Sequence, residues 1–308
     1  MNKIKGLGVA LVTPFNTDLS IDFLALENLI NLQIESGVDY IVLLGTTAES
    51  VVLSKSEKLE IISFSKKIIS SRITLVLGIG GNDTLSLVEE INNTNFTGID
   101  AVLSVSPYYN KPSQDGIYEH YKMISKACPV PIIIYNVPSR TSIDISIMTT
   151  LRLANNFKNI VAIKEASGNI DKISRIINEK PSNFVVLSGD DALTFPLICL
   201  GAEGVISVVG QSFPSDYGAM VRSAINGGGL AMLSRFVVGR HIAAGTLVSI
   251  LDEYVQEDVP IYAVYPSGKH LSPKVRAFLD FLIEIYGPVP YWDEAGDHKS
   301  EAAKRTVI

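Results

Sequence analysis

Short apolar runs alternate with longer amphipathic segments along the first 225 residues, and this alternation constrains the fold more than any other feature. Continuous apolar runs are typical of strands in a parallel sheet whose faces are covered. Eight such runs predict a closed (β/α)8 barrel, with an open doubly wound sheet as the alternative. The expected strands are residues 9–12, 40–44, 73–79, 99–105, 131–135, 160–163, 184–187 and 204–209.

Capping residues indicate where the first two expected helices begin. Asp22 precedes the amphipathic stretch that starts at Phe23, and Gly37 is placed to end that helix. Ser54 is followed three residues later by Glu57, the pattern of a capping box in which two side chains satisfy backbone amides. The last helix of the barrel is expected at about residues 215–225.

The composition argues against several classes of protein. Apolar residues make up 47% of the 308 residues and charged residues 19%, so the chain can bury a large core. A net charge of −6 argues against a nucleic-acid-binding surface. No apolar run approaches the roughly 18 residues of a membrane span. Cys128 and Cys199 lie in apolar stretches without metal-binding spacing, so we expect core thiols and a cytoplasmic protein.

Lys164 directly follows four apolar residues, at the carboxyl end of an expected strand. Burial disfavours an ammonium group and lowers its pKa, so a buried lysine can attack a ketone as a neutral amine and form a Schiff base. The alternative is a strand-end lysine whose amine reaches solvent along an apolar stem. The neighbouring strand ends decide between the two.

Active sites of barrels of this kind lie at the carboxyl ends of the strands. Two tyrosines, two adjacent threonines and one arginine follow strands of this chain and converge with Lys164: Tyr109, Tyr135, Thr46, Thr47 and Arg140. A phenol can move the proton that Schiff-base chemistry requires, and hydroxyl and guanidinium groups can hold carboxylates. Each residue alone has an ordinary reading, as a rim tyrosine, a strand-end threonine or a surface cation. Together they favour a catalytic site.

Two other ligand classes receive little support. Asp190 and Asp191 suggest a metal site, but none of the four histidines lies near the strand ends, so we expect no metal. The glycine-rich stretch at residues 78–81 suggests a phosphate site, but it lacks the lysine of a P-loop and the spacing of a dinucleotide fold.

Four strings carry a resemblance to a known family: GTTAE at residues 45–49, PYYNKP at 107–112, YNVPSRT at 135–141 and KEASG at 164–168. They resemble the dihydrodipicolinate synthase family, which belongs to the pyruvate-dependent class I aldolases. The resemblance covers about residues 4–226 and implies a (β/α)8 barrel without metal or organic cofactor. Ala48 and Ser139 stand where the family most often has glycine, and neither change removes a reacting group.

The resemblance implies a role for each residue of the site. Lys164 would form the Schiff base and Tyr135 would relay protons. Thr46 would link Tyr135 to Tyr109, which in this family reaches into a neighbouring subunit. The substrate-binding residues would be Thr47 for the pyruvate carboxylate, Arg140 for the carboxylate of aspartate semialdehyde, and Gly189 and Ile206 for the pocket wall.

After Gly227-Gly228-Gly229 the resemblance changes. Within the expected segment 227–292, about residues 228–287 resemble the end of the effector-binding domain of LysR-type regulators, without most of its sheet and without a DNA-binding helix-turn-helix. Residues 293–308 are polar, which is typical of a disordered tail. The chain is therefore expected to be a fusion of a catalytic barrel, residues 1–226, with a small foreign α/β segment.

The implied activity is a lyase-type condensation of pyruvate with aspartate semialdehyde, in lysine and diaminopimelate biosynthesis. The resemblance also implies a homodimer or homotetramer. Two alternatives stay open from the sequence. One is another pyruvate aldolase, such as N-acetylneuraminate lyase, and the position of Arg140 after the YNVPS string favours the synthase over it. The other is a catalytically silent effector-binding fusion, suggested by the segment after residue 227.

Overall fold

A computed structural model of the protein describes residues 2–226. Eight parallel strands pair in sequence order, and β8 pairs with β1, so the sheet closes into a barrel. This closure confirms the predicted (β/α)8 fold and rules out the open sheet. The strands are β1 (Gly6–Ala10), β2 (Tyr40–Leu43), β3 (Thr74–Gly78), β4 (Ala101–Val105), β5 (Ile132–Asn136), β6 (Ile160–Glu165), β7 (Val185–Ser188) and β8 (Gly204–Ser207).

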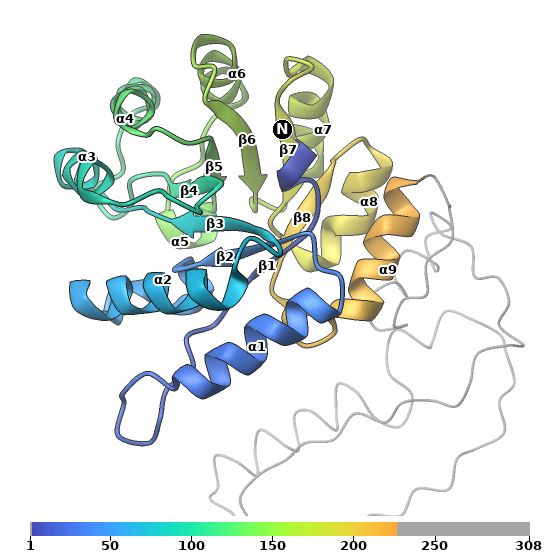
Figure 1. Ribbon diagram of the computed structural model, residues 1–308. Helices are drawn as coiled ribbons and strands as arrows, with labels where there is room; N and C mark the ends of the chain where they lie inside the picture. Colours follow the sequence, from blue (N-terminus) through green and yellow to red (C-terminus); the bar gives the residue numbers. More distant parts are fainter. Residues whose placement is uncertain (1, 227–308) are drawn as a thin grey trace, which may run out of the picture. The chain divides into compact units, whose positions relative to one another are not determined.

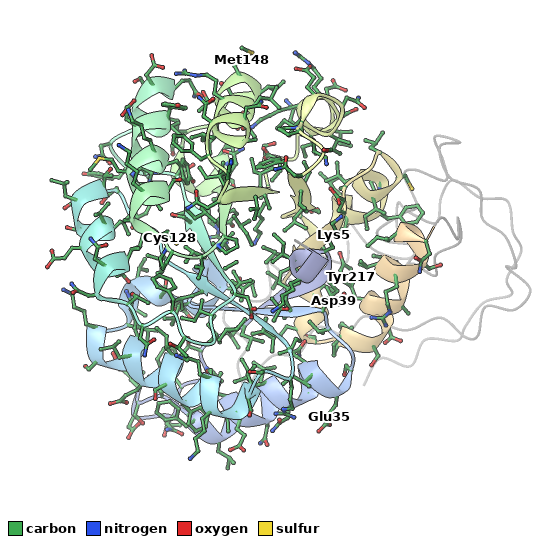
Figure 2. The ribbon with its side chains drawn as sticks, turned by 45° about the horizontal axis from the view of Figure 1, so that its top comes forward. Lys5, Glu35, Asp39, Cys128, Met148 and Tyr217 are labelled. Atoms are coloured by element: carbon green, nitrogen blue, oxygen red, sulfur yellow. The ribbon has the colours of Figure 1, made fainter. Side chains whose placement is uncertain are left out.

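Helices surround the barrel as an outer ring (Figure 1). Side chains on the outer faces of this ring, such as Glu35 and Met148, point away from the barrel (Figure 2). The helices are α1 (Phe23–Glu35), α2 (Lys55–Ile69), α3 (Thr84–Asn93), α4 (Gln114–Ala127), α5 (Pro138–Thr141), α6 (Ile147–Asn156), α7 (Ile170–Glu179), α8 (Thr194–Cys199) and α9 (Pro214–Ile225). Short 3-10 turns are η1 (Asn2–Ile4), η2 (Thr46–Ala48), η3 (Ser50–Val52), η4 (Asp191–Leu193) and η5 (Val209–Gln211).

The predicted helix starts are confirmed. The Asp22 side chain accepts a hydrogen bond from the backbone amide of Ala25 and caps α1. Ser54 and Glu57 form the reciprocal bonds of a capping box in front of α2. Each cap satisfies amides that have no partner inside the helix. The interpretations made for residues 227–292 and 293–308 lie outside the described residues.

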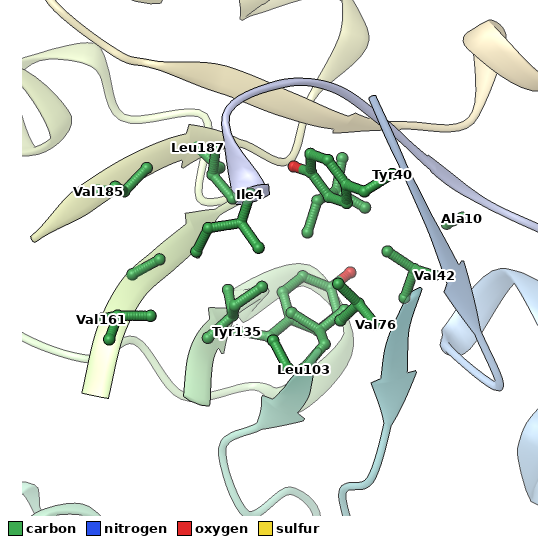
Figure 3. Close-up of a cluster of buried hydrophobic side chains, with 14 of the residues drawn as sticks. Ile4, Ala10, Tyr40, Val42, Val76, Leu103, Tyr135, Val161, Val185 and Leu187 are labelled. Carbon is green, nitrogen blue, oxygen red and sulfur yellow. The ribbon is translucent and has the colours of Figure 1, made fainter. Parts of the chain in front are cut away.

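A cluster of buried side chains fills the barrel interior (Figure 3). Because side chains alternate between the two faces of a strand, every second residue points inward. On β5 the inward residues include Ile133 and Tyr135, and on β6 they include Ala162, with Lys164 next on the same face. Asn136 and Glu165 are therefore directed outward, toward the helices.

Two expectations were wrong. The first strand begins earlier than residue 9, because Gly6 and Gly8 belong to it and contribute no apolar side chain to the pattern. A Cβ on Gly8 would lie 2.0 Å from the Tyr40 ring, so the backbone of β1 packs against that ring. Cys199 is exposed rather than a core thiol, because it ends α8, whose buried side is formed by Leu197 and Ile198; Cys128 is buried as expected.

Candidate active site

Lys164 and Tyr135 lie side by side at the carboxyl ends of β6 and β5. The strand register pairs the two residues directly, and both side chains are nearly buried, at 5% and 7% exposure. The Lys164 Nζ lies 4.5 Å from the centroid of the Tyr135 ring. The barrel therefore places an amine and a phenol together at the face where the chemistry of this fold occurs.

Burial lowers the pKa of Lys164 to about 8, against an ordinary value of 10.5. Removal from water is the largest cause, because it penalises the charged form. The Asp191 carboxylate opposes this change and raises the pKa, whereas the Arg140 guanidinium lowers it further. A substantial fraction of Lys164 is therefore a neutral, nucleophilic amine near neutral pH.

Tyr135 keeps its proton, since burial raises the pKa of its phenol. The positive charge of Arg140 and a hydrogen bond with the Thr46 side chain act in the opposite direction and lower it. A protonated phenol held by a neighbouring hydroxyl can donate a proton and recover it from that neighbour. Thr46 starts η2, the short turn that follows β2, and this turn brings its hydroxyl to Tyr135.

Arg140 is exposed at the rim on the four-residue helix α5, which follows β5 directly. Its charge acts on both Tyr135 and Lys164, so the guanidinium lies near the pair. Pro138 opens this turn and fixes its first residue in a helical conformation. The arrangement leaves a cation beside the reacting groups and open to solvent, where an anionic substrate can reach it.

Gly189 follows β7 and packs against Lys164. A Cβ at this position would lie 2.7 Å from the Ala166 Cβ and 3.1 Å from the Lys164 Cε, so a larger residue would displace the lysine stem. Ile206 is buried, at 1% exposure, on the inward face of β8. Gly189 therefore belongs to the wall around the amine, and Ile206 is part of the buried cluster inside the barrel.

Thr47 and Tyr109 follow β2 and β4, at the carboxyl face of the barrel. Thr47 is half-buried in η2, beside Thr46. Tyr109 is 89% exposed in the loop after β4 and has a backbone φ of 74°, a conformation that non-glycine residues rarely adopt. The single chain thus presents the Tyr109 ring outward.

Sequence reasoning missed the part that Asp191 plays. Its Oδ2 accepts hydrogen bonds from the backbone amides of Val208 and Val209, both at 3.0 Å, while its Oδ1 is buried without a hydrogen-bond partner. The Tyr217 hydroxyl, on α9 (Figure 2), donates to the Asp191 carbonyl at 3.0 Å. The sequence suggested Asp191 only as a metal ligand. In the structure it joins the loops after β7 and β8 and acts electrostatically on Lys164.

Within residues 2–226, no three histidine, cysteine, aspartate or glutamate side chains are grouped so that they could hold a metal ion. The same part of the chain contains no helix with the length and apolar character needed to cross a membrane.

Family models match the chain in two places. Residues 3–234 match the dihydrodipicolinate synthetase family, and residues 206–286 match the LysR substrate binding domain. The second match agrees with the resemblance of the carboxyl-terminal segment, although it begins inside the barrel, at β8.

Individual relatives and solved structures agree with the first match. A 4-hydroxy-tetrahydrodipicolinate synthase of Parabacteroides distasonis is 54% identical over 224 residues, covering 73% of this chain and 75% of the relative. The corresponding enzyme of Phocaeicola vulgatus is 52% identical over 225 residues, covering 73% of this chain and 76% of that protein. The crystal structure of dihydrodipicolinate synthase from Aquifex aeolicus superposes with a TM-score of 0.71 at 34% identity, covering 92% of this chain and 98% of that one.

A closed (β/α)8 barrel with a buried lysine of lowered pKa at its carboxyl face defines a lyase of the class I aldolase type. The chain belongs to the dihydrodipicolinate synthetase family.

Proposed function

We propose that this chain acts as a 4-hydroxy-tetrahydrodipicolinate synthase, which condenses pyruvate with aspartate semialdehyde in lysine and diaminopimelate biosynthesis. The observation that carries the proposal is the buried Lys164 amine. Its Nζ lies 4.5 Å from the centroid of the Tyr135 ring, and its pKa is lowered to about 8. The chain's identity of 54% to a relative with this activity supports the same conclusion.

The first stage is Schiff-base formation. The neutral amine of Lys164 adds to the ketone carbon of pyruvate, and the carbonyl oxygen becomes a hydroxyl as it takes up a proton. Tyr135 donates a proton to this hydroxyl, which leaves as water while the amine nitrogen forms a double bond to the former ketone carbon. Thr46 supports the proton transfer, because its hydroxyl is hydrogen-bonded to the phenol.

The second stage forms the carbon–carbon bond. The methyl group of the bound pyruvate gives a proton to the Tyr135 phenolate left by the first stage, and the resulting enamine attacks the aldehyde carbon of aspartate semialdehyde. The aldehyde oxygen takes up a proton and becomes a hydroxyl. The amino group of that substrate then adds to the imine carbon, closes the ring and releases Lys164 as an amine. These steps require only acid–base groups and an amine, and the proposed chemistry uses no metal or organic cofactor.

The remaining residues of the site bind the substrates in this proposal. Thr47 holds the carboxylate of pyruvate and Arg140 that of the aldehyde, while Gly189 and Ile206 shape the pocket. Tyr109 completes the proton relay of a neighbouring subunit, so the active form is a homodimer or homotetramer. Its 89% exposure in the single chain supports that role. The proposed enzyme works in the cytoplasm.

A substrate comparison tests the proposal. We expect the chain to consume pyruvate only when aspartate semialdehyde is added, and not to cleave N-acetylneuraminate. Arg140→Ala should raise the aldehyde KM, because it removes binding to both the ground state and the transition state. Lys111→Ala serves as the matched control, since it removes another exposed rim cation and should leave the aldehyde KM unchanged. Cleavage of N-acetylneuraminate, or an unchanged KM in Arg140→Ala, would contradict the substrate assignment.

A further inference from the structure

A buried charged cluster lies behind the reacting pair, on the outer face of the barrel. It consists of Asn136, Asp144, Glu165 and Lys172. Glu165 has no exposed surface and Lys172 is only 7% exposed, whereas Asp144 reaches solvent. Charged side chains are rarely buried this deeply without a partner. The cluster therefore links the strands β5 and β6 to the helix α7 through paired side chains.

The contacts within the cluster are direct. The Lys172 Nζ lies 3.1 Å from the Glu165 Oε2 and also pairs with the Asp144 carboxylate. The Asn136 Nδ2 donates to both carboxylates, at 2.7 Å to Asp144 and at 2.9 and 3.0 Å to the two oxygens of Glu165. The backbone amide of Ser167 donates to Glu165 at 2.8 Å. One lysine thus balances two carboxylates that share an amide donor.

The place of the cluster in the sheet connects it to the chemistry. Asn136 and Glu165 are register partners on β5 and β6, one residue beyond the paired Tyr135 and Lys164. Neighbouring residues of a strand point to opposite faces of the sheet. The cluster therefore links β5 and β6 on the outer face of the barrel, directly behind the reacting pair on the inner face. A shift of either strand end would therefore move the phenol relative to the amine.

The cluster also fixes the turn that carries Arg140. The Asn136 Oδ1 accepts from the backbone amide of Ile145 at 3.0 Å, and its Nδ2 donates to Asp144. These two bonds close the segment between Asn136 and Asp144, which contains α5 and Arg140. The same asparagine therefore anchors both the β5 end and the helix that bears the rim cation.

We infer that Lys172 is a positioning residue that keeps Tyr135, Lys164 and Arg140 in the relative positions that the reaction needs. It acts through its ion pair with the buried Glu165 and through Asn136, which both carboxylates share. This inference rests on the proposed function. Lys172 itself lies on α7, on the outer side of the sheet, and acts only through its partners. Displacement of reacting groups by about 1 Å lowers rates on the order of 10²-fold, so the effect of losing the cluster is measurable.

The test compares rates of adduct formation, measured by borohydride reduction after mixing with pyruvate. Lys172→Met leaves Glu165 as a buried carboxylate without its cation, and we expect the rate at saturating pyruvate to fall by roughly 10²-fold. The dependence on pyruvate concentration should stay nearly unchanged, because Thr47, the proposed carboxylate-binding residue, follows β2 and lies outside the cluster. The double variant Glu165→Gln/Lys172→Met removes both charges and should recover roughly tenfold of the loss.

Lys180→Met is the matched control. Lys180 follows the same helix and pairs with Glu203 at 3.0 Å, but Glu203 precedes β8 at the opposite end of the barrel. We expect this variant to lower the melting temperature without changing the adduct rate. If Lys172→Met does not fold, the near-isosteric Glu165→Gln carries the test, with the same expected loss of rate.

Failure of the proposed function and failure of the positioning role give different results in this assay. Failure of the unmodified chain to form any pyruvate adduct would overturn the proposed function. Normal adduct formation by the unmodified chain, together with an unchanged rate in folded Lys172→Met or Glu165→Gln, would overturn the positioning role alone.

Discussion

Two charge-removing substitutions near Lys164 are expected to shift the pH dependence of Schiff-base formation in opposite directions. Asp191 raises the pKa of Lys164 and Arg140 lowers it. Asp191→Asn should therefore move the rise in rate to lower pH, and Arg140→Met should move it to higher pH. Asparagine keeps an oxygen that can accept from the Val208 and Val209 amides, so the loop contacts of Asp191 are preserved in kind.

The fraction of Lys164 that is neutral in the unmodified protein follows from the burial of its amine. With a pKa of about 8 instead of 10.5, roughly a tenth of Lys164 is neutral at pH 7, which is about 300 times the fraction for an exposed lysine. The adduct rate of the unmodified protein should thus rise with pH and level off above about 8.

The assay mixes protein and pyruvate at each pH and transfers timed samples to borohydride at one common pH. Intact-mass measurement then gives the fraction of protein with an adduct. Asp171→Asn is the control, because Asp171 is exposed on α7 and does not affect the pKa of Lys164. Shifts of the same sign in both variants, or no shift in either, would refute the electrostatic account of the amine.

Three further predictions concern single residues. Tyr135→Phe should lower turnover by roughly 10²-fold or more with little change in melting temperature, measured by steady-state kinetics and thermal unfolding. Gly189→Ala should lower the adduct rate because its Cβ would meet the Lys164 Cε at 3.1 Å, whereas Gly81→Ala, whose nearest contact would be 3.5 Å, should not. Burial lowers the pKa of His120 from 6.5 to about 4, so the free energy of unfolding should decrease as pH falls through that window. Urea titrations should show a smaller decrease in His120→Gln.

The barrel could be predicted from sequence because each buried strand left an uninterrupted apolar run. The bounds of β1 were predicted wrongly, because Gly6 and Gly8 have no apolar side chain to extend the run toward the amino terminus. The ring of Tyr40 occupies the space above Gly8. The pairing of Tyr135 with Lys164 was also accessible from sequence, since both stand at strand ends that meet in a barrel.

Other parts of the site could not be predicted from the sequence. Lys172 stands in an amphipathic helix, where a lysine usually faces solvent, yet it lies on the buried side of α7 with Ile173 and Ile176. Its partners Asn136 and Glu165 belong to the strings YNVPSRT and KEASG. From the sequence alone, these strings were explained by the catalytic residues next to them, so no structural role was assigned to Asn136 or Glu165. Asp191 likewise depends on tertiary structure, because the amides that it accepts from belong to the loop after β8.

The most direct test of the central claim is to locate the pyruvate adduct after borohydride reduction by peptide mass spectrometry. The account predicts a single modified residue, Lys164, and no adduct in a folded Lys164→Ala variant. Lys111 is exposed in a polar loop at the same rim and should remain unmodified. An adduct on Lys111, or on another lysine with Lys164 unmodified, would contradict the claim that the buried amine is the nucleophile.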